Sequence, residues 1–537
     1  MTAWQSTRTD AWQALEKLRG EFDRPENHLR QLLKDSARFD RFSLEGGGLF
    51  FDFSRQRING EVRAALKLLA AAARLAERFS EMTAGVKINT TENRAALHTA
   101  ARRFSETPIV VDGADVMADI RAERNKIRQF SAQVRSGQIT GSTGKPFTDA
   151  VVIGIGGSYL GTEFVSRALA ASADGLTLHF LANVDVHDFG RIASRIDPET
   201  TLWIVVSKSY TTAETMANAR LAETFMRERS IDPARHTVSV TAKGSPGDDP
   251  DRPLLASFYM FDFIGGRYSV TSAVGGVPLS LQLGYEAFER FLKGAEEMDR
   301  HAENAPAAEN LPMTAALIGI WNNNFLGYDT QAIIPYAAPL EKFAPHVQQL
   351  YMESNGKAAD ADGGFVETKT GVIVFGEPGT NAQHSFFQLA HQGRPFPIDF
   401  IGVVRPQYEQ YTAQSRGVTN HQELWANLIA QPMALAVGKD SEDAARYFSG
   451  NRPSSTLLLP DLSPESVGRL LSFYEARTVF EAFVWGINPF DQFGVELGKK
   501  LADGIRKEMA AKNENPGRSF EDRDPVERYY LERLFKN

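Results

Sequence analysis

A short apolar run passes directly into a glycine turn in Ala150-Val-Val-Ile-Gly-Ile-Gly-Gly-Ser158. The run Ala150–Ile155 predicts a buried β-strand, because it is short, continuous and bounded by turn residues. Helical patterns, such as the one from Thr212 to about Glu228, separate it from three similar runs: Leu176–Leu181, Thr201–Val206 and Thr237–Thr241. Strands that alternate with helices are typical of βαβ units, so we expect a parallel sheet covered by helices.

A second group of apolar runs follows Leu283 and predicts another sheet, again with helical segments between its strands. These runs are Asp329–Pro335, Gly371–Phe375 and Asp399–Val404. The first 110 or so residues are expected to be helical, with Ala64–Glu77 as a strong helix-forming segment. The highly charged tail from about Phe520 predicts a helix-rich arm. The order of the strands in either sheet does not follow from these patterns.

Length and composition indicate a globular protein with more than one domain. The chain has 537 residues, too many for one ordinary core, with 42% hydrophobic and 23% charged residues. No apolar run approaches the roughly 20 residues that cross a bilayer, and the first residues lack the layout of a secretion signal. We therefore expect a cytoplasmic protein without membrane contact.

The residue counts also exclude some chemistry. The chain has no cysteine, which rules out disulfides, thiolate metal sites and a cysteine nucleophile. Its net charge of −8 argues against non-specific nucleic-acid binding, which favours basic surfaces. An anionic small-molecule substrate stays possible, because local charge in a cleft can oppose the net charge.

Two segments that follow predicted strands are candidates for phosphate binding. The turn Gly154–Ser158 precedes a helical pattern, but it matches neither the dinucleotide fingerprint nor the Walker loop, and a simple tight turn explains it equally well. The segment Ser207-Lys-Ser-Tyr-Thr-Thr-Ala-Glu-Thr215 has five hydroxyl-bearing Ser and Thr residues in nine positions. Thr211 and Glu214 have the spacing of a capping box, which uses only one hydroxyl. The surplus hydroxyls favour a phosphate site over a merely capped helix, at the strand ends where parallel sheets bind ligands.

Four further side chains suit acid–base chemistry. Glu353 precedes the turn residues Asn-Gly, and Arg267 follows two glycines. His384 ends a loop, where a histidine has a higher chance of being functional. Lys499 lies four residues after Val495, which predicts that it points inward on a helix. Each also has an ordinary structural explanation, and a lone glutamate is usually solvated.

Together these segments resemble the glucose-6-phosphate isomerase family. The motifs that carry the resemblance, in the family's order, are Ser207–Thr215, Gly265–Gly275, Met352–Lys357, Gly379–His384 and Asn488–Lys499. The resemblance runs from about residue 150 to 500. It implies two αβα sandwich domains of the sugar-isomerase (SIS) type with parallel or mostly parallel sheets. The smaller would be residues 115–283, the larger residues 1–114 plus 284–500, with residues 501–537 as a C-terminal helical arm.

The resemblance also implies an activity. Family members interconvert glucose 6-phosphate and fructose 6-phosphate through a cis-enediol(ate), in glycolysis and gluconeogenesis, without a metal or other cofactor. They are usually homodimers whose active sites are completed across the interface. Two other readings remain open: a phosphosugar isomerase that also accepts mannose 6-phosphate, and a non-catalytic sugar-phosphate sensor. The presence of a candidate base and its partners disfavours the sensor.

Residue roles follow from the same resemblance. Glu353 is expected to shuttle the proton, Arg267 to stabilise the enediolate, and His384 and Lys499 to assist ring opening. Glu214 is a possible partner that orients His384. The expected substrate-binding residues are Gly157, Ser158, Ser207, Lys208, Ser209, Thr212, Thr215, Gln349 and Gln492. The chain departs from the commonest family pattern at Tyr159, where an acidic residue is frequent, and at Ala382, where glycine is usual.

Overall fold

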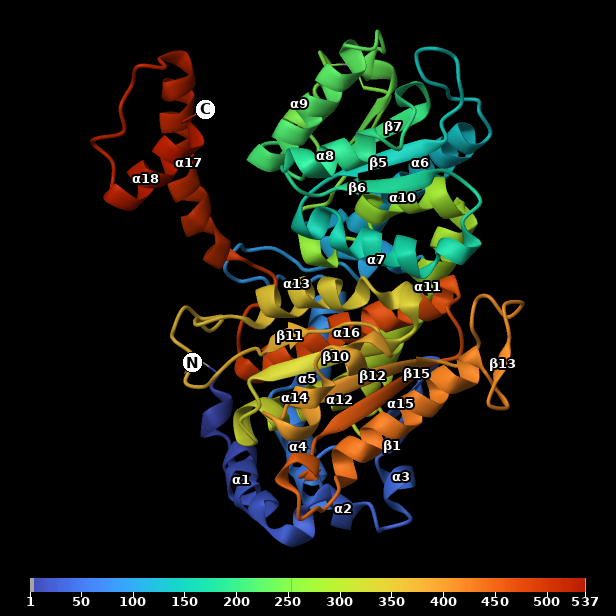
Figure 1. Ribbon diagram of the computed structural model, residues 1–537, viewed down its shortest axis with the longest axis vertical. Coiled ribbons are helices and arrows are strands. Elements are labelled where there is room, and N and C mark those ends of the chain that lie inside the picture. Colours follow the sequence, from blue (N-terminus) through green and yellow to red (C-terminus); the bar gives the residue numbers. More distant parts are fainter. Residues whose placement is uncertain (1–3, 253, 537) are drawn as a thin grey trace. The chain divides into compact units, whose positions relative to one another are not determined.

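The computed structural model describes residues 4–252 and 254–536 (Figure 1). The chain divides into two compact units, Met1–Phe490 and Asp491–Asn537. The first unit holds two mostly parallel sheets, and the second is helical. The α/β fold class with two such sheets, predicted from the sequence, is confirmed.

A five-stranded sheet contains all the strands predicted around the glycine turn. In spatial order its strands are β6 (Thr177–Leu181), β5 (Asp149–Ile153), β7 (Thr201–Val206), β8 (Thr237–Thr241) and β9 (Ala256–Tyr259). Every neighbouring pair is parallel. The order reverses between β5 and β7, because β6 lies on one side of β5 and the later strands lie on the other. Open parallel sheets bind ligands at such a switch point, beyond the carboxyl ends of the strands.

Both faces of this sheet are buried, which explains the continuous apolar runs. On β5, Ala150 and Val152 belong to the main core, whereas Val151 and Ile153 belong to a second core that includes residues of α8 and α9. The helices around the sheet are α6 (Val116–Arg135), α7 (Leu160–Ala168), α8 (Val186–Ala193), α9 (Ala213–Arg227) and α10 (Ala273–Leu283). Successive side chains of a strand point to opposite faces, so each face needs its own helical layer.

The second sheet has six strands. In spatial order they are β1 (Ser43–Gly46), β2 (Leu49–Asp52), β15 (Ser454–Leu459), β12 (Ile398–Val403), β10 (Thr330–Tyr336) and β11 (Ile373–Phe375). The four strands from β15 to β11 are parallel, and they include the three predicted ones. The hairpin β1–β2 is antiparallel and adds to the edge of β15. The helices α14 (Phe387–Gln392) and α15 (Asn420–Val437) pack against one face of this sheet.

The prediction that the first 110 or so residues are helical is wrong in several places, among them residues 85–109, which contain only the short helix Ala100–Arg102. Residues 43–52 form the hairpin β1–β2 around glycines, and Gly47 and Gly48 adopt positive φ angles. The predicted helix Ala64–Glu77 is divided into α4 (Gly60–Ala72) and α5 (Leu75–Thr83). Arg74, in the left-handed conformation with φ 53°, separates the two helices.

A long buried helix, α16 (Pro464–Trp485), lies at the centre of the first unit. It packs against α11 (Tyr285–Asn304), α12 (Leu311–Ile320) and α13 (Phe343–Asn355). Within it Arg477 bonds to Glu481 and to Asp399 of β12, so the buried charges are paired. The hydroxyl of Tyr351, on α13, donates to Glu481. This buried network fixes α13 over the sheet.

The remaining elements lie towards the ends of the chain and in loops. In the first unit they include α1 (Asp10–Arg19), α2 (Leu29–Leu32), α3 (Arg38–Arg41), the hairpin β3 (Val110–Val111) with β4 (Ala114–Asp115), and the hairpin β13 (Gln414–Ser415) with β14 (Val418–Thr419). The second unit contains α17 (Glu496–Glu514) and α18 (Pro525–Leu534). Within residues 4–252 and 254–536 no helix is long and apolar enough to cross a membrane.

The predicted domain boundaries each enclose one sheet. Strands β5–β9 lie within residues 115–283, and the six-stranded sheet lies within residues 1–114 and 284–500. Both sheets belong to the first compact unit, so this division stays a prediction. The predicted arm, residues 501–537, lies within the second unit, which begins at Asp491.

Candidate active site

The two predicted phosphate segments lie side by side at the switch point of the five-stranded sheet. The glycine turn follows β5 and the hydroxyl-rich loop follows β7, and these strands are parallel neighbours with Ile153 paired to Val205. Gly156, with φ 57°, lets the chain turn into α7. The sequence predicted that both segments follow strands of one parallel sheet, but not that these two strands are neighbours.

Backbone approaches backbone closely at Gly157. A Cβ atom at this position would lie 2.2 Å from the carbonyl carbon of Gly266 and 2.6 Å from the nitrogen of Arg267. The Ser269 hydroxyl donates to the Gly157 carbonyl at 3.2 Å. Only glycine fits here, so the glycine turn and the Gly265–Ser269 segment are held together.

Arg267 joins this turn to the candidate base. Its side chain is buried, and its Nη1 lies 3.1 Å from Glu353 Oε2. Its Nε donates to the Ser354 hydroxyl at 2.7 Å, and its Nη2 donates to the Pro489 carbonyl. Three fixed acceptors therefore set the orientation of the guanidinium, which in turn holds one oxygen of the Glu353 carboxylate.

Glu353 lies in the last turn of α13, where its side chain is 25% exposed. One turn earlier, Gln349 Nε2 donates to the same carboxylate oxygen at 3.3 Å. Gln349 also lies against the glycine turn, 2.9 Å from the Cβ position of Gly156. Its Oε1 is buried and has no hydrogen-bond donor among the described residues, so it is an acceptor that a substrate hydroxyl would satisfy. The structure thus brings Gly157, Arg267, Gln349 and Glu353 together.

The loop after β7 offers more hydroxyls than its own geometry uses. The Ser207 hydroxyl accepts from the Tyr210 amide at 3.1 Å, and the Thr211 hydroxyl donates to Ser209 at 2.7 Å. The predicted capping box is wrong, because Thr212 is the N-cap residue of α9 and its side chain makes no capping bond. The first amides of α9 are therefore left without a side-chain cap, which suits an anion at this helix end.

Two other predicted binding residues complete the loop. Thr215 is buried on the first turn of α9. Lys208 forms an ion pair with Asp262 at 3.2 Å and donates to the Asp262 carbonyl at the same distance. Its side chain is thus engaged by Asp262, and the backbone contribution near Lys208 stays a prediction.

His384 lies apart from this constellation in the first unit. It is exposed at the end of the short helix Asn381–His384, and neighbouring Gln383 accepts from Tyr336 at 3.0 Å and donates to Asn427 at 3.0 Å. Within residues 4–252 and 254–536 no hydrogen bond or ion pair joins His384 to Glu353 or to Glu214. The structure of one chain therefore does not bring these three predicted residues together.

Lys499 and Gln492 belong to the second unit and are described within it alone. The prediction that Lys499 points inward is wrong, because the lysine is exposed and α17 has no buried residue. Val495, which served as the reference for that prediction, precedes the helix and is itself exposed.

One contributor was not predicted. Ser354 accepts from Arg267, and its hydroxyl also lies 3.0 Å from the Tyr268 hydroxyl. Burial raises the pKa of Tyr268 to about 12, so it stays protonated at this contact. Ser354 lies next to Glu353 in the sequence, but nothing in the sequence indicates that its partners come from residues 267 and 268.

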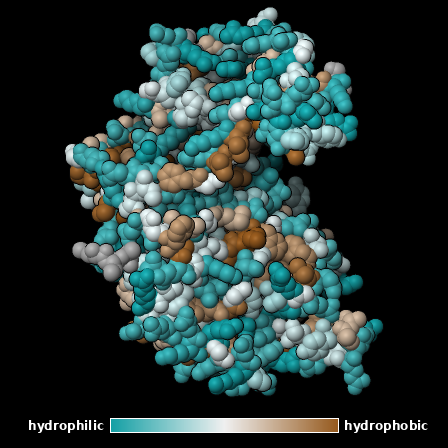
Figure 2. Space-filling view, turned by 90° about the vertical axis from the view of Figure 1, so that its left-hand side faces the viewer, coloured by the Kyte–Doolittle hydropathy of each residue, from teal (hydrophilic) through white to brown (hydrophobic). Residues whose placement is uncertain are grey.

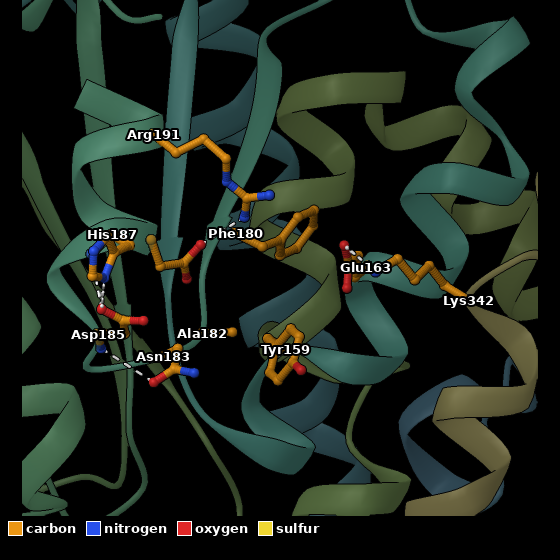
Figure 3. A pocket seen from close by; sticks show the side chains of 10 residues that line it. Tyr159, Glu163, Phe180, Ala182, Asn183, Asp185, His187, Arg191 and Lys342 are labelled. Atoms are coloured by element: carbon orange, nitrogen blue, oxygen red, sulfur yellow. Dashed lines mark hydrogen bonds and ion pairs between the residues drawn. The ribbon is translucent and has the colours of Figure 1, made fainter. Parts of the chain in front are cut away.

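A cavity of about 530 Å³ opens beside the glycine turn, on the β6 side (Figure 3). Tyr159, the residue that departs from the family pattern, faces it together with Phe180 and Glu163. Glu163 pairs with Lys342 at 3.2 Å, and Asp188 pairs with Arg191 at 2.6 Å. The Tyr159 ring is thus part of the wall between α7 and α8.

The described residues hold no group of three or more His, Cys, Asp or Glu side chains with the geometry of a metal site. The assembled site instead contains a carboxylate, a fixed guanidinium, an amide and a loop of hydroxyls. Such a set suits proton transfer on a phosphorylated substrate, with the carboxylate as base and the cation beside the developing negative charge.

Comparisons with known proteins agree with this chemistry. The family model described as phosphoglucose isomerase matches residues 52–522. A protein of Desulfosudis oleivorans named glucose-6-phosphate isomerase is 65% identical, over 98% of this chain and 98% of its own length. A rice protein (Oryza sativa subsp. japonica) named cytosolic glucose-6-phosphate isomerase B is 47% identical, over 94% of this chain and 92% of its own. A crystal structure of a glucose-6-phosphate isomerase from Chlamydia trachomatis superposes with a TM-score of 0.90 at 36% identity, covering 99% of each chain.

Proposed function

Because this chain belongs to the phosphoglucose isomerase family, we propose that Glu353 is the base in its interconversion of glucose 6-phosphate and fructose 6-phosphate. The observation that carries the proposal is the bond from Arg267 Nη1 to Glu353 Oε2 at 3.1 Å, which fixes a cation beside the carboxylate. The same guanidinium lies where negative charge develops on the substrate during proton transfer.

The phosphate of the substrate binds at the loop after β7. Four hydroxyls, of Ser207, Ser209, Thr212 and Thr215, hold its oxygens together with the uncapped amides at the start of α9. Gly157 and Ser158 of the neighbouring turn contact the sugar, and the free acceptor of Gln349 takes a sugar hydroxyl. These contacts place C1 and C2 of the open-chain sugar at Glu353.

The proton then moves between adjacent carbons. Glu353 removes the proton from C2 of the aldose, and the electron pair moves to O1 to give a cis-enediolate. Arg267 stabilises the negative charge. The carboxylic acid of Glu353 returns the proton to C1, while the proton of the O2 hydroxyl passes to O1 and O2 becomes the ketone oxygen. The reaction needs one base, and every atom is conserved.

Ring opening is assigned to His384 and Lys499, with Glu214 orienting the histidine and Gln492 bonding substrate oxygens. We place His384 in the active site of a second copy of the chain, within a homodimer. The support is its exposed position beside exposed apolar side chains of α14 and α15, which are Leu389, Ile429 and Met433. Hydrophobic residues occur only in small separate patches on the largely hydrophilic face seen in Figure 2. A dimer interface would bury such side chains.

We also place the enzyme in the cytoplasm. The plant relatives named as cytosolic isomerases, at 46–47% identity, support this location. The alternative of a pure sugar-phosphate sensor has no support in the site, because binding alone needs neither the base nor its guanidinium partner.

The test is the variant Glu353→Gln. We expect turnover to fall by about 10²–10⁴-fold, because the amide cannot accept the proton, while binding of fructose 6-phosphate stays within a few-fold. Glu286→Gln, at an exposed position of α11, is the matched control. Wild-type turnover in Glu353→Gln would overturn the assignment. In the wild type, solvent deuterium at C2 of glucose 6-phosphate supports the enediol path.

A further inference from the structure

A second cavity, of about 200 Å³, lies between α6, α11 and the segment at residues 103–105. It shares no residue with the site at β5 and β7. Its lining combines arginines with aromatic and polar side chains: Arg103, Phe104, Ser105, Arg121, Arg124, Asn125, Arg128, Tyr285 and Glu289. Four arginines and one glutamate give this arginine cleft a formal charge of +3, in a chain whose net charge is −8.

Arg124 forms the buried wall of the arginine cleft. Its side chain is only 9% exposed, and its Nε and Nη2 both donate to the Ala101 carbonyl, at 3.1 and 2.6 Å. Its Nη1 donates to the Arg103 carbonyl at 3.0 Å. Across the described residues no ion pair joins Arg124 to a carboxylate. Burial lowers the pKa of this guanidinium, which indicates a desolvated charge that lacks a close counterion.

Aromatic rings hold two of the guanidinium groups in place. The Arg124 guanidinium lies over the Phe104 ring at 4.5 Å, and the Arg128 guanidinium lies over the Tyr285 ring at 4.5 Å. Stacking fixes the plane of each guanidinium. Three of the five N–H groups of Arg124 bond to backbone carbonyls and Nη2 of Arg128 bonds to Glu289, so each guanidinium keeps further N–H groups for an acceptor. Two cationic edges are therefore ordered before any ligand arrives.

Acidic neighbours neutralise the cleft only in part. Arg128 pairs with Glu289 at 2.6 Å, and Glu289 also pairs with Lys293 at 2.7 Å. The other two ion pairs are longer, with Arg103–Glu303 at 3.3 Å and Arg121–Asp115 at 3.7 Å. The Glu296 carboxylate accepts a hydrogen bond from the Phe104 backbone amide at 3.0 Å.

We propose that the arginine cleft is a second anion site, which binds the phosphoryl group of inorganic phosphate or of a small phosphate ester. Planar guanidinium groups bind phosphate oxygens in pairs, and a cavity of this size has room for one such group. The site takes its residues from α6 of the predicted smaller domain and from α11 of the predicted larger domain. Its occupant therefore bonds across that boundary, away from the catalytic loops.

Equilibrium dialysis with inorganic phosphate tests the proposal by counting bound phosphate per chain. We expect two sites in the wild type, one at the loop after β7 and one in the arginine cleft. Arg121 and Arg128 are exposed, so the double variant R121Q/R128Q should fold normally. It should bind one phosphate, lose affinity for the other by at least about tenfold, and keep the wild-type KM for fructose 6-phosphate.

The control R195Q/R300Q removes the same charge from two exposed arginines elsewhere and should keep both sites. A parallel titration with glycerol 3-phosphate distinguishes the two sources by stoichiometry: two bound per chain indicate a cleft that accepts esters, and one bound, at the loop after β7, indicates a cleft for inorganic phosphate. Equal phosphate binding in the wild type and R121Q/R128Q overturns the proposal. An equal loss of phosphate binding in R195Q/R300Q also overturns it, since the loss would then follow from net charge. A raised KM in R121Q/R128Q overturns it as well, since the loss would then belong to the catalytic site.

Discussion

Arg267 and Glu353 meet through one hydrogen-bonded ion pair, with Nη1 and Oε2 3.1 Å apart. The arginine comes from the loop after the five-stranded sheet, and the glutamate comes from α13 of the second sheet's layer. The same guanidinium bonds to Ser354 and to the Pro489 carbonyl. One side chain thus fixes the relative positions of three segments and holds the base.

Arg267→Lys should separate the two roles of this side chain. A lysine ammonium cannot reach the three acceptors together, because it lacks the fork of a guanidinium. We expect kcat to fall by about 10²–10³-fold, the usual effect of losing one preorganised donor at a developing negative charge. The KM for fructose 6-phosphate should change much less, since the phosphate loop is untouched. Steady-state kinetics check this, with the exposed Arg300→Lys as control; a kcat near the wild-type value would contradict the role of Arg267.

Gly157→Ala should disrupt the contact between the glycine turn and the arginine loop. The new Cβ would lie 2.2 Å from backbone of Gly266, so one of the two segments must move. We expect a loss of stability of about 1–3 kcal/mol, as for other overpacked sites, and a larger loss of activity because Arg267 moves with the loop. Urea denaturation and kcat measure the two effects.

The matched control is Gly190→Ala. Gly190 lies within α8 and has nothing within 4 Å of its Cβ position. Alanine has the higher helix propensity, so this variant should be as stable as the wild type or slightly more stable. Equal behaviour of the two variants would show that crowding at Gly157 is unimportant.

The sequence predicted the strands that consist of an apolar run, and missed those that lack one, including β9, the hairpin β1–β2 and β15, which is largely buried but begins with Ser-Ser-Thr. All six residues of β7 are buried, which gives an unbroken apolar run with the predicted bounds. In β9 only Phe258 is buried, so no such run exists. The hairpin β1–β2 is short and gains its place by pairing with β15, near the other end of the chain. No local pattern records that pairing.

The candidate site shows the same division. The phosphate loop was predictable because its hydroxyls are local, and excess hydroxyls at a strand end have few other uses. The partners of Arg267 were not predictable, since they come from Ser354 and Pro489. The prediction of Glu353 as the base depends on the family resemblance, because nothing in the local sequence distinguishes a catalytic glutamate from a solvated one. The prediction that Lys499 points inward is wrong because helical spacing predicts which residues share a face, but not whether that face is buried.

Mixing two inactive variants tests the shared active site. If His384 acts in the site of a partner copy, Glu353→Gln and His384→Ala chains form a mixed dimer with one intact site. Random reassembly should then restore about a quarter of the wild-type activity, because half the dimers are mixed and each has one working site of two. Activity after denaturation and refolding of an equimolar mixture measures this. No recovery, with dimers present by light scattering, would contradict a site completed across the interface.

His346 predicts a pH dependence of stability. Burial lowers its pKa from the usual 6.5 to about 4, and its Nε2 has no partner among the described residues. The unfolded chain therefore binds more protons between pH 6.5 and 4, so stability is lost as the pH falls through this window. The expected loss from this group is about 3 kcal/mol, since each pKa unit corresponds to 1.36 kcal/mol.

His346→Phe should remove that contribution and keep the packing, because the ring stacks on Phe164 with centroids 5.8 Å apart. We expect similar stability of the variant and the wild type at pH 7.5, and a more stable variant at pH 5. Urea denaturation at both pH values measures the difference. The control is His187→Asn, which replaces a 90% exposed imidazole of α8 and is measured at the same two pH values. If His346→Phe and the wild type lose the same free energy of unfolding between pH 7.5 and 5, the buried imidazole is not the group that titrates.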